Sequence, residues 1–207
     1  MSNSQRHGKM IEDHWKAAFP GASDAGRSQQ SPWDIEPEYD RALGLPTFVE
    51  ALKFPQKAIC MADARKMWGQ TDYRILIARY QQRGDVKRVF QLLEVLIAPD
   101  QQASLLGDVT LEEVADFHRR IQCVFFEDDK EAQIFAKKHK RDVFGNRSLL
   151  QLNPKISGTQ RRVQCSLSLA VVLSELKSST TVYGENDFYR NVAVAFAVQS
   201  SPREFSR

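Results

Sequence analysis

Long hydrophobic runs are missing from this sequence. No stretch approaches the roughly 18 apolar residues that a membrane-spanning helix needs. The segment Met1–Lys9 is polar and has no hydrophobic core of the kind found in a secretory signal. These absences argue against a membrane protein with helical spans and predict a cytoplasmic location.

Cysteine and histidine are also scarce. The three cysteines, Cys60, Cys123 and Cys165, lie too far apart along the chain to predict a zinc site or a disulfide framework. The four histidines share no metal-ligand spacing either. Neither residue type therefore indicates a zinc centre or a secreted, disulfide-stabilised domain.

A strong charge of one sign is absent as well, because the formal net charge is only +3. Bulk charge therefore does not indicate a nucleic-acid partner. The charges are nevertheless unevenly distributed: acidic residues gather in Glu36–Asp40 and Glu127–Asp129, and basic residues gather in Lys137–Arg141 and Arg161–Arg162. Local positive patches on a near-neutral protein suit a partner that is held at one face.

The 207 residues, 42% of them hydrophobic, are enough for one domain with a sizeable core. Hydrophobic periodicity predicts helices at Gln5–Phe19, Ala62–Trp68, Thr110–Gln122, Phe125–Arg141 and Leu169–Leu176. It predicts strands at Trp33–Ile35, Thr47–Phe54, Arg74–Gln81, Val86–Ala98, Leu149–Leu152 and Val163–Leu167, although Phe90–Ile97 also fits a helix. We therefore expect a single α/β domain over residues 1–207, with a central mixed β-sheet flanked by helices.

Two carboxylates and a lysine near the N-terminus suggest phosphodiester chemistry. Hydrolysis of a phosphodiester needs a neutralised phosphate and an activated water, and carboxylates supply both by holding Mg²⁺. A nearby lysine can orient the water or stabilise developing negative charge. Asp34 lies in Pro32-Trp33-Asp34-Ile35, and Glu50 and Lys53 follow in Val49-Glu50-Ala51-Leu52-Lys53. The ordinary alternatives are that Asp34 caps a turn and that Glu50 is exposed on an edge strand.

The order of these segments resembles the PD-(D/E)xK nuclease superfamily, and type II restriction endonucleases in particular. The matching segments are Gln5–Glu12, Pro32–Ile35, Val49–Lys53, Ala58–Trp68, Leu152–Lys155 and Gln160–Ser166. The resemblance implies a restriction-endonuclease-like fold and a Mg²⁺-dependent endonuclease that cuts double-stranded DNA at a specific short sequence, leaving 5′-phosphates. It also implies that Asp34 and Glu50 bind the metal, that Lys53 assists the water, and that Glu12 supports the site from an early helix.

The chain departs from the family at one position. The usual spacing is Glu-x-Lys, which places both side chains on one face of a strand. Here Leu52 occupies the expected lysine position and Lys53 comes one residue later. In a regular strand Lys53 would therefore point away from Glu50.

Three arrangements could accommodate this spacing. A β-bulge at Ala51-Leu52 would return Lys53 to the face of Glu50. Another lysine, Lys57 or Lys9, could reach the site instead. In the third arrangement the strand register differs and Glu50 occupies the lysine's place, which would weaken or inactivate the site.

The later half of the chain, about residues 125–207, is expected to contribute DNA contacts. Arg can bond guanine bidentately, and Gln can do the same with adenine. The residues predicted to contact DNA are Lys137, Lys138, Lys140, Arg141, Gln160, Arg161, Arg162 and Gln164. The alternatives are a solvated helix end for the lysine-rich run and a salt-bridged loop for the Gln-Arg-Arg segment.

A homodimer is expected, because two symmetric subunits match a palindromic site and cut both strands. Other functions are also compatible with the sequence. They are a repair or junction-cleaving nuclease of the same superfamily, a DNA-binding protein of this fold that has lost catalysis, and a structural protein with no DNA role.

Overall fold

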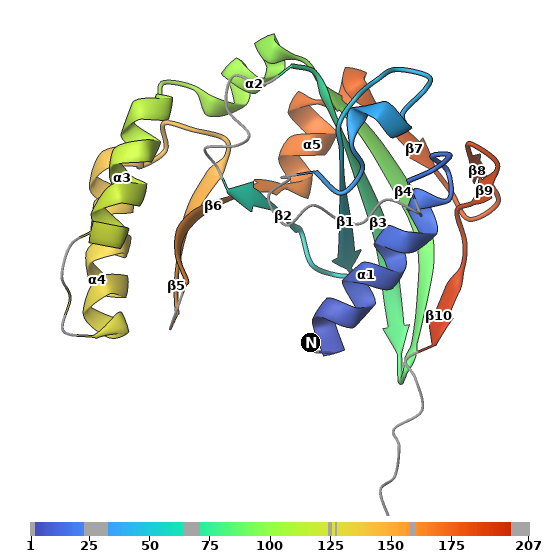
Figure 1. The fold of residues 1–207 in the computed structure, drawn as a ribbon, viewed down its shortest axis with the longest axis horizontal. Helices are drawn as coiled ribbons and strands as arrows, with labels where there is room; N and C mark the ends of the chain where they lie inside the picture. Colours follow the sequence, from blue (N-terminus) through green and yellow to red (C-terminus); the bar gives the residue numbers. More distant parts are fainter. Residues whose placement is uncertain are drawn as a thin grey trace, which may run out of the picture. The chain divides into compact units, whose positions relative to one another are not determined.

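The computed structural model describes residues 3–22, 33–63, 71–123, 126, 128–157 and 160–199. The protein is an α/β structure whose chain divides into two compact units (Figure 1). Unit 1 comprises Met1–Lys57, Arg74–Leu96 and Ser179–Arg207, and unit 2 comprises Ala58–Tyr73 and Ile97–Ser178. The later half of the chain, expected to contribute DNA contacts, is thus divided between the two units.

Unit 1 is built on a mixed five-stranded sheet. Its elements are α1 (Asn3–Lys16), η1 (Pro37–Tyr39), β1 (Thr47–Lys53), β3 (Tyr73–Arg83), β4 (Val86–Ile97), β7 (Thr180–Tyr183), β8 (Phe188–Tyr189), β9 (Val192–Ala193) and β10 (Ala197–Gln199). The strand order is β1-β3-β4-β10, with β7 also paired to β4, and β8 pairs separately with β9. β1 runs parallel to β3, whereas β7 and β10 run antiparallel to β4.

Helix α1 packs on β1 and buries one face of the sheet (Figure 1). Its apolar residues recur three and four positions apart, and Ile11 and Trp15 are 1% and 0% exposed. They share a core cluster with Val49 of β1 and with alternate residues of β3, among them Leu76 and Ala78. Because side chains alternate along a strand, the odd-numbered residues of β1 face α1 and the even-numbered residues face the opposite side.

Unit 2 contains a three-stranded antiparallel sheet in the order β2-β6-β5. Its elements are β2 (Ala58–Asp63), α2 (Pro99–Leu106), α3 (Leu111–Cys123), α4 (Asp129–His139), η3 (Lys140–Phe144), β5 (Gln151–Ser157), β6 (Gln160–Ser168) and α5 (Leu169–Glu175), with η4 (Lys177–Ser179) at its boundary. Helices α3 and α4 lie side by side along β6 and β5 (Figure 1). His118 of α3 is only 3% exposed, and its Nδ1 accepts a hydrogen bond of 3.4 Å from the backbone of Val163.

The mixed sheet with flanking helices is confirmed, and most predicted elements are present with shifted ends. Phe90–Ile97 is strand rather than helix, and Trp33–Ile35 forms only an isolated bridge, Ile35 to Thr47. The helix predicted at Ala62–Trp68 is wrong at its start, because Ala62 and Asp63 belong to strand β2; residues 64–70 lie outside the described residues. No helix in the described part of the chain is long and apolar enough to cross a membrane.

Candidate functional site

Asp34 lies at the outer edge of β1. The backbone N–H groups of Asp34 and Ile35 both donate to the carbonyl oxygen of Thr47 at 3.0 Å. This places the Asp34 side chain beside the next residues of the strand, where its Oδ2 accepts a hydrogen bond of 2.8 Å from the Val49 N–H. The residue is 8% exposed, so the carboxylate is held at a fixed, largely buried position on β1.

Strand β1 places Glu50 and Lys53 on opposite faces. Its pairing with β3 is unbroken from Thr47–Arg74 to Lys53–Tyr80, so the ladder contains no bulge at Ala51-Leu52. Lys53 therefore shares the α1 side of the sheet with Ala51, and Glu50 lies on the other side. The first of the three arrangements considered from the sequence is thus not the one adopted by β1.

A second lysine, Lys87, lies near Lys53 on the α1 side of the sheet. Lys87 of β4 is 5% exposed, and its Nζ lies 5.0 Å from the centroid of the Tyr80 ring. Burial lowers the pKa of Lys87, and the positive charge of Lys53 lowers it further. Burial raises the pKa of Tyr80, and the negative charge of Glu50 adds to that effect. Two neighbouring cations with this mutual repulsion would be stabilised by an anion bound beside them.

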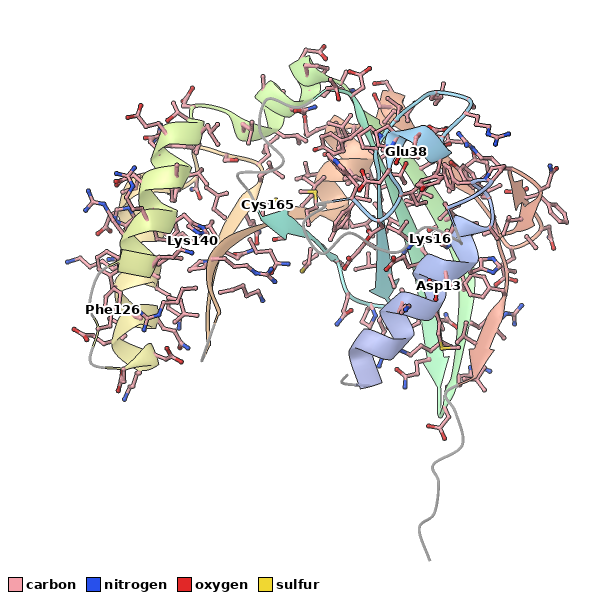
Figure 2. All side chains as sticks on the ribbon, viewed as in Figure 1. Asp13, Lys16, Glu38, Phe126, Lys140 and Cys165 are labelled. Atoms are coloured by element: carbon pink, nitrogen blue, oxygen red, sulfur yellow. The ribbon has the colours of Figure 1, made fainter. Side chains whose placement is uncertain are left out.

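Glu12 is the buried carboxylate of α1. It is 9% exposed, and its Oε1 lies 2.9 Å from the Nζ of Lys16, which is also on α1 (Figure 2). His14 stacks on Phe196, with 3.6 Å between the ring centroids, and the Phe196 carbonyl accepts from Val89 of β4. His14 therefore marks the flank of α1 nearest β4. Glu12 and His14 are two positions apart in the helix, which separates them by about 200° around its axis. Glu12 therefore lies on the opposite flank of α1, toward β1.

These positions divide the predicted catalytic residues into two sets. Glu12 and Lys53 lie on the α1 side of the sheet, Glu50 lies on the other side, and Asp34 lies at the strand edge that borders both. Among the described residues, no group of three or more His, Cys, Asp or Glu side chains is arranged to hold a metal ion. Mg²⁺ in nucleotide-processing sites commonly binds one or two carboxylates together with substrate phosphates, a smaller set than a site built from protein ligands alone.

A buried ionic cluster lies beside this edge, and sequence reasoning missed it. Arg74 of β3 is 0% exposed and lies 3.0 Å from Asp40 and 2.8 Å from Glu94. The distances are those of ion pairs, although the alignment falls short of hydrogen bonding. Arg190 supplies a second cation, 2.9 Å from Asp40. The cluster thus balances two arginines against two carboxylates.

Tyrosines complete the cluster around Glu94. The hydroxyl groups of Tyr183 and Tyr189 donate to the Glu94 carboxylate at 3.0 and 2.8 Å. Burial raises the pKa of Tyr183 to about 12, and the Glu94 charge acts in the same direction. Burial also raises the pKa of Tyr189. Both phenols therefore stay protonated and remain donors at neutral pH.

The cluster fixes the loop that joins Asp34 to β1. Besides its two arginines, Asp40 accepts backbone hydrogen bonds from Leu43 and Leu45 at 3.4 and 3.3 Å. Burial raises the pKa of Asp40, but the hydrogen bond from Arg190 and the charge of Arg74 outweigh it, so the pKa is below its ordinary value. Asp40 is thus a charged anchor for the residues between Asp34 and β1, which helps to hold Asp34 in place.

The basic run predicted to contact phosphates lies at the end of α4 and in η3. Lys137 and Lys138 are exposed, and Arg141 is exposed with its Nε 3.2 Å from Asp142. Lys140 is half-buried and donates a hydrogen bond of 2.9 Å to Asn153 of β5 (Figure 2). Burial lowers the pKa of Lys140.

Strand β6 separates the two arginines of the Gln-Arg-Arg segment. Arg161 faces the helices: it lies 5.5 Å from the centre of the Phe126 ring and 3.7 Å from Asp129. Arg162 and Gln164 face the opposite side of the sheet, where Arg162 is exposed and Gln164 is half-buried. The side chain of Gln160 lies outside the described part of the chain. Because side chains alternate along a strand, the neighbouring residues Arg161 and Arg162 lie on opposite faces, which the sequence of β6 already implies.

Comparison with models of protein families, with curated proteins and with solved structures gives no match for this chain. Any functional assignment therefore rests on the residues and the geometry described above.

Proposed function

We propose that this protein is a Mg²⁺-dependent endonuclease with a restriction-endonuclease-like fold, which hydrolyses phosphodiester bonds of double-stranded DNA at a specific short sequence. The observation that carries the proposal is the Asp34 carboxylate, anchored by the Val49 N–H on the same strand that presents Lys53. A fixed carboxylate can bind a divalent cation, and a lysine on the strand that anchors it can assist the water that attacks the phosphate.

The α1 side of the sheet is the better candidate for the reaction. It brings Lys53 to the same face as the buried carboxylate of Glu12, with Asp34 at the adjoining edge. In this arrangement Asp34 and Glu12 would hold the ion. The rival arrangement pairs Asp34 with Glu50 on the other face, which removes Lys53 from the site and predicts catalysis that does not need this lysine.

Each residue has a defined task in the proposed reaction. The ion, when bound, supplies positive charge to the scissile phosphate and lowers the pKa of a bound water. The ammonium group of Lys53 orients the attacking water and stabilises the charge that develops on the phosphate. Lys87 adds positive charge beside it. The water oxygen bonds to phosphorus, the bond to the 3′ oxygen breaks, and that oxygen takes up a proton, which leaves a 5′-phosphate and a 3′-hydroxyl.

Incubation of the full chain with supercoiled plasmid tests the proposal. With Mg²⁺ we expect discrete linear fragments, and in excess chelator we expect intact plasmid. Fragments that a ligase rejoins without kinase treatment would carry the expected 5′-phosphates. Discrete fragments cut in both strands also fit the expected homodimer, whereas scattered nicks or cutting only at branched junctions would indicate a repair-type nuclease.

A second candidate is a DNA-binding protein that has lost catalysis. It is favoured by Leu52, which occupies the position where the Glu-x-Lys pattern has its lysine. Salt-sensitive binding of plasmid with no cleavage in Mg²⁺ or Mn²⁺ would support this candidate and reject the enzyme.

A further inference from the structure

The hairpin formed by β5 and β6 is amphipathic across its two faces. The register pairs Lys155 with Arg162, Asn153 with Gln164, and Gln151 with Ser166. The residues between these pairs face the helices, as the 2% exposure of Leu152 shows. One face of the hairpin, apolar except for Arg161, is therefore covered by α3 and α4, whereas the other carries only polar side chains between Gln151 and Lys155 and between Arg162 and Ser166.

The polar face has a charge and a composition that suit one kind of partner. The hairpin residues 151–168 contain no Asp or Glu, and two of their three cations, Lys155 and Arg162, lie on this face, whereas Asp63 of β2 is paired with Gln164 at its base. Lys155 and Arg162 lie opposite one another and are both exposed. Their positive charge complements a polyanion, and Arg and Gln are the side chains that bond base edges bidentately.

The position of Asn153 on this face is fixed by other side chains. Its Oδ1 accepts from Lys140 at 2.9 Å, and its Nδ2 donates to Ser166 Oγ at 2.8 Å. Asn153 thus joins η3 to the two strands and orders the base of the polar face. Gln164 lies directly opposite Asn153, and Lys155 and Arg162 lie beyond them toward the hairpin tip.

The hairpin also has the right dimensions. Among the described residues, β2 pairs with β6 from Ser168 to Gln164, and the part nearer the tip, Pro154–Ser157 with Gln160–Val163, is a two-stranded ribbon with Gln164 at its base. The major groove of B-DNA, about 12 Å wide, admits a two-stranded β-ribbon. Neighbouring residues on one face of a strand are about 7 Å apart, which is close to two base-pair steps of about 3.4 Å.

We propose that the polar face of the β5–β6 hairpin enters the major groove of double-stranded DNA and selects the sequence through Arg162, Gln164 and Lys155. This inference rests on the proposed nuclease function and identifies the surface that gives it specificity. Arg161, on the opposite face of the same strand, takes no part in base reading. Lys140 contributes by ordering Asn153 and by adding positive charge at the edge of this face.

Selection from a pool of duplex DNA with a randomised central segment tests this assignment, with the full chain and excess chelator so that nothing is cut. We expect wild type to enrich one sequence motif. Arg162→Gln is expected to lose the preference for one base position by about 10- to 100-fold. Arg161→Gln, a matched change on the neighbouring residue, is expected to enrich the wild-type motif. Thermal unfolding midpoints verify that both variants are folded.

A second variant and an RNA competitor test the same assignment independently of Arg162→Gln. Gln164→Leu is expected to weaken the base preference at a second position of the enriched motif. This variant tests the inference if Arg162→Gln does not fold. The inference is overturned if both variants keep the full wild-type motif, if wild type enriches no motif, or if a randomised RNA duplex pool competes equally, because the deep, narrow major groove of RNA does not admit such a ribbon. Cleavage of plasmid by the same preparation would show that the nuclease proposal survives such a failure.

Discussion

Replacement of Arg74 by methionine is expected to lower the free energy of unfolding by about 3–5 kcal/mol, the usual cost of removing one partner from a buried ion pair. The substitution removes the cation that lies 3.0 Å from Asp40 and 2.8 Å from Glu94. Asp40 would keep Arg190, whereas the described partners left to Glu94 would be the hydroxyl groups of Tyr183 and Tyr189. Urea denaturation at pH 7 measures the difference.

Arg88 provides the matched control for this prediction. It lies on β4, and its ion pair with Glu185, at 3.1 Å, is between side chains that are 65% and 47% exposed. Arg88→Met is therefore expected to cost less than about 1 kcal/mol. Equal effects of the two substitutions would show that the Arg74 cluster does not stabilise unit 1 as described.

The same cluster predicts a pH dependence through Asp40. Its pKa is lowered in the folded protein from an ordinary value of 3.8, so its contribution to stability is present above that value and is lost as the pH falls through the folded pKa. Asp40→Asn should therefore destabilise the protein at pH 7. The stability gap to wild type should shrink when both are compared at pH values below about 4.

Replacement of Lys53 by methionine is expected to lower the cleavage rate by about 10³-fold, as removal of a group that acts on the reacting phosphate commonly does. The long apolar stem is kept, so the loss reports on the ammonium group. Single-turnover cleavage of supercoiled plasmid at saturating protein measures the rate. The physical reason is that Lys53 occupies the α1 side of β1 together with the proposed ion site.

Glu50→Gln is the matched comparison, because it changes a charged residue on the other face of the same strand. It should reduce the cleavage rate by less than about threefold, within the range of indirect effects on a nearby site. The reverse pattern, with Glu50 essential and Lys53 dispensable, would place the reaction on the opposite face of the sheet. Both variants need unfolding midpoints close to wild type for the comparison to hold.

The local pattern of the sequence predicted the elements that position the site. The 3.6-residue periodicity of α1 and the apolar runs of β1, β3 and β4 are strong local signals, and the Gly84-Asp85 turn gives the hairpin. Strands β7–β10 have only two to four residues each, too few for periodicity to show. Helix α2 begins at Pro99, and its N-cap residue, Ala98, has no polar side chain. The proline is therefore the main local feature of the sequence that indicates the start of this helix.

One feature of the candidate site could be predicted from the sequence and another could not. The opposite placement of Glu50 and Lys53 followed from strand alternation, and only an irregular strand would have changed it. The ionic cluster joins Asp40, Arg74, Glu94 and Arg190, which are far apart in the sequence, and no local pattern indicates such pairing. The cluster helps to hold Asp34 in place through Asp40, an effect that the motif around Asp34 does not indicate.

Direct measurement of a bound cation tests the central claim, that the Asp34 carboxylate on the edge of β1 holds a divalent ion. Mn²⁺ can be titrated into the full chain in the presence of duplex DNA and followed by electron paramagnetic resonance, which separates bound from free ion. Wild type should show a saturable bound population that Mg²⁺ displaces, and a folded Asp34→Asn variant should not. Equal binding of Mn²⁺ by wild type and by folded Asp34→Asn would contradict the account.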